Sequence, residues 1–280
     1  MQADAVSASR WHMFTLFKYA IYAILIVNIG LFLFDDWAAA QAAYGEDFGD
    51  MSLIALFPST IDTAAWVLLL LLFELETWVI SDQTLADKRV QYTLSLGRLL
   101  AGSVIVYSLY GYWLIVLQSY ALSPLADSAA LCDMAARGYQ LVESLGEYAP
   151  ISAQQCQQYA STDWLVHHQQ LAMGPADSWQ LAQRLAWLDV VNATVWVLVV
   201  IVLEADVWLQ LRGRFEGLLM LLSRYVKAVL YAVLAVAVFA WLFMADWLSA
   251  WDAAIWLIAF VFIEMNILQW NAETSEQADA

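Results

Sequence analysis

Long apolar runs alternate with shorter polar segments along the chain, and this alternation predicts six membrane-spanning helices. Each run holds about twenty mainly apolar residues, the number that a helix needs to cross the hydrocarbon core of a bilayer. The runs cover residues 14–34, 61–80, 97–118, 189–210, 219–243 and 252–270. Strands of a membrane barrel would be shorter and would alternate apolar with polar residues. The pattern therefore indicates an all-α integral membrane protein, and the first run is too long for the apolar core of a signal peptide.

Three of these runs share one arrangement of polar and aromatic residues. Each begins with Asp or Asn, has Trp four residues later, Glu eight residues after the Trp, and a second polar residue two positions further on. In chain order the four columns are Asp62, Asn192 and Asp252; Trp66, Trp196 and Trp256; Glu74, Glu204 and Glu264; and Glu76, Asp206 and Asn266. Because the unit recurs every second span, it predicts three pseudo-repeated helical hairpins related by an axis along the membrane normal.

Basic residues are distributed unevenly between the two sides of the predicted spans. One side carries Arg10, Lys18, Lys88, Arg89, Arg98, Arg212, Arg214, Arg224 and Lys227, whereas the other carries only Arg137 and Arg184. Since cytoplasmic loops are enriched in Lys and Arg, this bias predicts that both termini are cytoplasmic in a bacterial-type inner (plasma) membrane. The hydrophobic share of 63% and the mean hydropathy of +0.64 agree with a multi-pass membrane protein.

The polar segments divide the chain into five parts. These are a cytoplasmic tail at 1–13, spans one to three at 14–118, a periplasmic cap at 119–188, spans four to six at 189–270, and a cytoplasmic tail at 271–280. We predict that the cap is small and helical, with helices starting near Pro124, Ser152 and Pro175. Residues 35–60 are predicted to form an acidic outer loop.

The only two cysteines, Cys132 and Cys156, both lie in the predicted cap. In an oxidising compartment such a pair predicts a disulfide, which would join the first two helices of the cap. The alternative is a pair of buried thiols that are not joined.

The repeated carboxylates are the leading candidates for a functional site. An acidic residue inside an apolar span is costly and is a functional-site hypothesis by default. Glu74 lies twelve residues after Asp62, which is roughly 18 Å of helix and places it on the cytoplasmic side of the membrane centre. The first hypothesis is a cation or proton channel or transporter. Its three glutamates would share protons or hold a cation, and Asp62, Asn192 and Asp252 would line the outer mouth.

The second hypothesis gives the same acids a structural role. The odd spans carry cations near their inner ends, and Lys18, Arg98, Arg224 or Lys227 could each neutralise an acid of the repeat. Buried acid–base pairs of this kind can specify helix register without any transport. The protein would then be a scaffold or regulatory subunit whose cap binds a partner.

The net charge and the motifs of the sequence limit the classes of function that the protein could have. The net charge of −16, concentrated on the outer side, attracts cations or solvates the surface, and no basic patch suits nucleic acid. Adjacent His167 and His168 do not have the spacing of helical metal ligands, so no metal ligand set is identified. No phosphate-binding loop or nucleophile motif is present, so an integral-membrane enzyme is the third and least favoured hypothesis, and we expect no cofactor. The predicted partners are the lipid bilayer, a cation or proton under the first hypothesis, and another copy or a membrane partner subunit.

Overall fold

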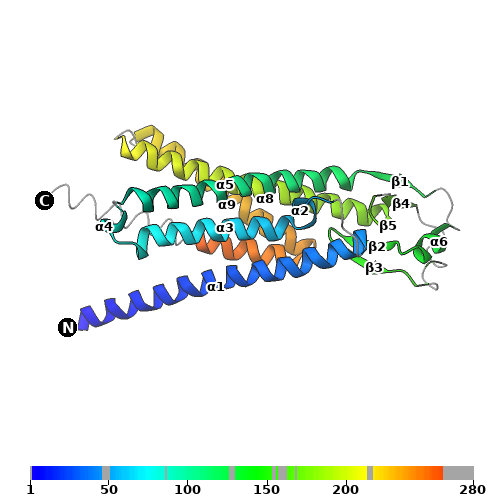
Figure 1. Cartoon of the computed structure of the whole chain (residues 1–280), viewed down its shortest axis with the longest axis horizontal. Helices are drawn as coiled ribbons and strands as arrows, with labels where there is room; N and C mark the ends of the chain where they lie inside the picture. Colours follow the sequence, from blue (N-terminus) through cyan, green and yellow to red (C-terminus); the bar gives the residue numbers. More distant parts are fainter. Residues whose placement is uncertain are drawn as a thin grey trace. The chain divides into compact units, whose positions relative to one another are not determined.

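The computed structural model describes residues 2–45, 51–85, 87–125, 130–152, 156, 163–167, 169–212 and 217–260. The chain is mostly helical and carries one small sheet (Figure 1). It forms two compact units, one from Met1–Ile29 with Leu198–Ala280 and the other from Gly30–Val197. Helices α1 and α8 each contribute to both units.

Long helices dominate both units. They are α1 (Gln2–Tyr44), α3 (Pro58–Glu74), α5 (Lys88–Ser119), α8 (Ala176–Leu211) and α9 (Gly217–Phe243). Shorter elements are α2 (Leu53–Leu56), α4 (Asp82–Leu85), α6 (Ala130–Ala136) and the π-helix η1 (Leu75–Val79). A further apolar helix covers Trp247–Phe260.

Among the described residues, four helical segments are long and apolar enough to cross a membrane. They are Thr15–Tyr44, Lys88–Ser119, Ala176–Asp206 and Gly217–Phe243. This finding agrees with the multi-pass membrane protein that the apolar runs predict. The second predicted span falls on α3 and η1, which follow one another without a break. The sixth is described only as far as Phe260, and its remaining residues lie outside the described ranges.

The first predicted outer loop is shorter than expected because α1 continues to Tyr44. Asp36 is therefore a helical residue and is only 9% exposed. Its carboxylate accepts hydrogen bonds from the backbone nitrogen of Thr60 at 2.9 Å and from the Thr60 hydroxyl at 2.7 Å. Because Pro58 occupies the first turn of α3, Asp36 satisfies a backbone donor that the start of this helix leaves without an intrahelical acceptor.

The segment between α5 and α8 contains a sheet, so the prediction of an all-helical cap was wrong. Its strands are β1 (Leu122–Pro124), β2 (Gln140–Ser144), β3 (Glu147–Pro150), β4 (Trp164–His167) and β5 (Ala172–Pro175). Their order is β1-β4-β5-β2-β3, and only the β2–β5 pair is parallel. We call residues 122–175 the outer domain.

Glycine positions explain why strands replace the expected helices there. Gly138 has φ of 92°, a conformation that stops α6 after two turns, and Gly146 has φ of 76° in the turn between β2 and β3. Only glycine adopts such angles at little cost. The Gln-Leu-Val sequence of β2 and the Trp-Leu-Val sequence of β4 also favour strands. The helix expected to begin at Pro175 is present as the start of α8.

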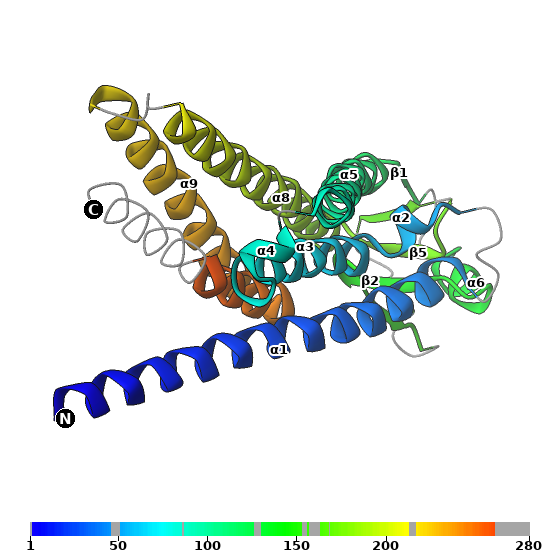
Figure 2. The same ribbon diagram turned by 60° about the vertical axis from the view of Figure 1, so that its left-hand side comes forward.

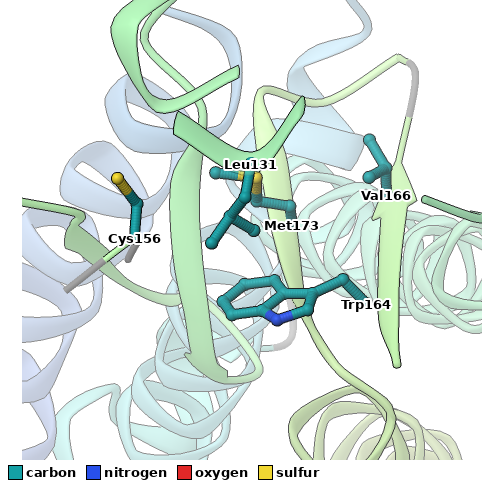
Figure 3. Packing of buried hydrophobic residues seen from close by; sticks show 5 residues of the cluster. All are labelled: Leu131, Cys156, Trp164, Val166 and Met173. Atoms are coloured by element: carbon teal, nitrogen blue, oxygen red, sulfur yellow. The ribbon is translucent and has the colours of Figure 1, made fainter. Parts of the chain in front are cut away.

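The predicted disulfide between Cys132 and Cys156 is confirmed. Cys156 belongs to the core of the outer domain together with Leu131, Trp164, Val166 and Met173 (Figure 3). Leu131 and Met173 are fully buried. The disulfide therefore attaches α6 to the same core that the inner faces of β4 and β5 provide.

Hydrogen bonds fasten the outer domain to helix ends within the Gly30–Val197 unit. The backbone nitrogen of Leu171 donates to the carbonyl of Ala43 at 2.6 Å, at the end of α1. The His167 ring accepts from the backbone of Gln170 at Nδ1, so its Nε2 carries the proton and donates to the Gln118 carbonyl of α5 at 3.0 Å. The sheet is thus held by helices and not only by the chain connections.

Close packing of α5 against α2 gives a direct test of this unit. A Cβ atom at Gly111 would lie 2.9 Å from the carbonyl oxygen of Ile54 and 2.7 Å from its Cγ1. We expect Gly111→Ala to destabilise the protein by about 1–3 kcal/mol through overpacking. Gly102→Ala in the same helix is the matched control, because nothing lies within 4 Å of its added methyl group. Thermal unfolding in detergent should show a lower midpoint for Gly111→Ala alone, and equal midpoints would contradict the packing.

Candidate functional site

Two acids in the last column of the repeat, Glu76 and Asp206, are each paired with a cation from the following helix. Arg98 of α5 contacts Glu76 at 2.8 Å, and their side chains are 40% and 30% exposed. Lys227 of α9 contacts Asp206 at 3.1 Å, and the side chains of Lys227 and Asp206 are 24% and 13% exposed. The Ser223 hydroxyl also donates to Asp206, at 2.6 Å. Two equivalent positions of the repeat therefore use their acids in the same way, each within its own unit.

The main glutamate column does not have one common environment. Glu74 at the end of α3 is buried, with 4% exposure, and η1 begins immediately after it. Glu204 of α8 is exposed, as is Arg224 of α9. Lys18 of α1 is almost completely buried, with 2% exposure. Glu264 and Asn266, the third members of the two acidic columns, lie outside the described residues.

The first column of the repeat is polar, and its two aspartates accept side-chain hydrogen bonds. Asp62 accepts a long hydrogen bond of 3.4 Å from the Tyr112 hydroxyl. Asp252, in the other unit, accepts from the Asn28 side-chain amide at 2.7 Å. The Oδ1 atom of Asn192 is buried and receives no hydrogen bond from the described residues. Buried polar atoms usually have a partner, so this amide oxygen is a place where a donor or a cation would be stabilised.

Contact between two repeated tryptophans brings part of this column together. The rings of Trp66 in α3 and Trp196 in α8 are 6.3 Å apart. The two helices run in the same direction (Figure 1), and Asp62 and Asn192 each precede the contacting Trp by four residues. Residues four apart lie on the same face of a helix. Asp62 and Asn192 thus belong to one polar layer on the facing sides of α3 and α8.

Several partners of these residues were not identified from the sequence. Asn28 was visible as a lone amide inside an apolar run, which is a signal for an intramembrane hydrogen bond. Tyr112 and Ser223 gave no such signal, because tyrosine and serine are common in membrane helices. Asp36 falls in the predicted outer loop at 35–60, whereas the structure places it in α1.

The outer domain offers few groups for acid–base chemistry. Burial raises the pKa of Tyr148 in β3 well above its ordinary value, and the nearby Tyr44 raises it further. Its hydroxyl therefore remains protonated at neutral pH. His167 already uses both ring nitrogens in hydrogen bonds, and His168 lies outside the described residues. Among the described residues, no three His, Cys, Asp or Glu side chains are arranged to hold a metal ion.

No protein-family model matches this sequence, and comparisons with curated proteins and with solved structures found no match. A functional proposal therefore depends on the contacts described above.

Proposed function

We propose that the protein is a multi-pass membrane scaffold or regulatory subunit that binds a partner through its outer domain. The observation that carries this proposal is the pairing of Glu76 with Arg98 and of Asp206 with Lys227. Each pair neutralises an acid of the repeat inside its own unit. Such pairs account for repeated carboxylates in apolar helices without an ion path. The proposal includes six spans in three pseudo-repeated hairpins, with both termini in the cytoplasm of a bacterial-type inner membrane.

The outer domain supports the same proposal. It has its own apolar core and a disulfide, and it is hydrogen-bonded to the ends of α1 and α5. A folded surface fastened to membrane helices can present a fixed shape to a partner, because little conformational entropy is lost on binding. Exposed positions such as Glu143 on β2 are available for contact.

A second candidate, a cation or proton channel or transporter, is favoured by two buried oxygen sites. Glu74 is 4% exposed, and the Asn192 Oδ1 atom is buried without a donor from the described residues. Asp62 lies about 18 Å before Glu74 on the same helix, so α3 carries an acid at both ends of its apolar stretch. In this candidate Glu204, Glu264 and Asp252 would complete the path.

Ion flux in proteoliposomes distinguishes the two candidates. The wild-type protein is compared with Glu74→Gln, and with Glu147→Gln on β3 as a carboxylate control outside the helices. We expect no flux of H⁺, K⁺, Na⁺ or Ca²⁺ above that of empty liposomes for any of the three proteins. Flux that Glu74→Gln abolishes and Glu147→Gln preserves would overturn the scaffold proposal and establish the ion path.

The scaffold proposal also has a direct test in cells. A photo-cross-linking residue replacing Glu143 should give one discrete protein adduct after illumination of intact membranes. The same residue replacing the exposed Leu117 of α5 is the control for non-specific capture. An outer domain that gives no adduct at Glu143 and at other exposed strand positions would contradict partner binding there.

A further inference from the structure

Helices α8 and α9 form a hairpin that carries two different sets of charges. The two helices run in opposite directions along the chain (Figure 2). Between them, Asp206 accepts from Ser223 and contacts Lys227. These contacts join the two helices within one chain.

A second acid and a second base lie on the outside of the same hairpin. Glu204 and Arg224 are both exposed, and neither forms a salt bridge within the part of the chain that the structure describes. Glu204 stands two positions before Asp206, which places it on the face of α8 that points away from α9. Opposite charges are thus displayed at exposed positions of the hairpin, apart from the pair between its two helices.

The two charges lie at the same level along the hairpin. Glu204 is seven residues before the end of α8 at Leu211, and Arg224 is seven residues after the start of α9 at Gly217. Each is therefore about 10 Å from the joining segment. A two-fold axis parallel to the membrane normal keeps every atom at its depth. It can consequently bring Glu204 of each copy to the level of Arg224 of the other.

The residues around Glu204 and Arg224 favour pairing of these two charges between copies. A long arginine side chain can reach the head groups by itself, whereas the shorter glutamate depends more on a cationic neighbour. The exposed residues around Arg224 are apolar and include Leu221, Leu222 and Tyr225. Ala228 and Ala232, one and two turns further along α9, are also exposed and would allow close helix approach.

We propose that two copies of this chain associate through the outer faces of the α8–α9 hairpin, with Glu204 of each copy paired with Arg224 of the other. The pairing rests on the membrane location of the hairpin and is independent of the proposed function. Glu204 and Arg224 have opposite charges and can pair reciprocally across a two-fold axis, which makes a second copy a matching partner.

Charge exchange between two tagged copies tests the proposal. Glu204→Arg alone places arginine against arginine, and Arg224→Glu alone places glutamate against glutamate. We expect each variant to lose self-association by roughly tenfold or more in lipid nanodiscs or vesicles, measured by energy transfer between labelled copies. A mixture of the two variants should associate as well as the wild type, because both contacts are then restored between different copies.

The mixture of Glu204→Arg and Arg224→Glu distinguishes pairing between copies from pairing inside one chain. If Glu204 and Arg224 each served an intramolecular contact, mixing the variants would restore nothing, and that result would overturn the proposal. A wild-type protein that stays monomeric at every protein-to-lipid ratio would also overturn it. Formation of the Cys132–Cys156 disulfide and the thermal midpoint of each variant report folding. Arg89→Glu, an exposed change at the start of α5, controls for altered net charge.

Discussion

Replacing both Cys132 and Cys156 with serine is expected to destabilise the outer domain by about 3.5 kcal/mol. The cysteines are 24 residues apart, and closing a loop of that length restricts the unfolded chain by about this free energy at 25 °C. The outer domain depends strongly on the constraint, because its buried cluster is small and its strands are three to five residues long. Cys156 itself is only 3% exposed, so the serine variant also places a polar group in the core.

Limited proteolysis of intact membranes measures this effect. The wild-type outer domain should resist cleavage, and the double serine variant should be cut at least about a hundredfold faster if cleavage follows the open population. Reduction of the wild type should reproduce the fast cleavage, whereas the reductant should change nothing in the serine variant. Equal resistance of the oxidised wild type and the variant would show that the sheet is stable without the disulfide.

Replacing Lys227 with alanine is expected to cost about 3 kcal/mol of unfolding free energy. The change leaves Asp206 with only the Ser223 hydroxyl bond in a largely buried position, and breaking a buried pair from one side is strongly destabilising. Arg98→Ala should cost about 1 kcal/mol or less, because Arg98 and Glu76 are 40% and 30% exposed. The two equivalent positions of the repeat are thus expected to differ in their contribution to stability.

Thermal unfolding of the variants in one detergent checks this order. Asp206→Asn added to Lys227→Ala should recover part of the loss, because it removes the unpaired charge. Lys88→Ala, an exposed basic residue at the start of α5, is the control and should stay within about 0.5 kcal/mol of the wild type. An Arg98→Ala variant as unstable as Lys227→Ala would contradict the conclusion that the Asp206–Lys227 pair is more buried than the Glu76–Arg98 pair.

The coarse architecture was predictable because it depends on local sequence. Apolar runs of span length have few alternatives to membrane helices, and four of the predicted spans are present as long apolar helices. Two cysteines in one extramembrane segment left a single possible pairing, which the structure confirms. The spacing of acids and cations in the repeat likewise pointed to acid–base pairs, and Glu76–Arg98 and Asp206–Lys227 are two of them.

The form of the outer domain was not predictable from local pattern alone. Strands of three to five residues carry little periodic signal, and the pairing of β1 with β4 and of β2 with β5 joins segments far apart in the chain. Pro124 reads equally as the start of a helix or the end of a strand. Long-range hydrogen bonding and the shared core decided between these possibilities.

By itself the sequence determined that the protein has long apolar helices typical of membrane spans, that its two cysteines have only each other to pair with, and that acids recur at matching positions. These properties follow from composition and spacing along one element. Only the tertiary structure decided that Glu74 is buried and Glu204 exposed, although both occupy the same column of the repeat. The reason is physical: burial is set by the neighbours that surround a helix face, and those neighbours come from other parts of the chain or from other molecules.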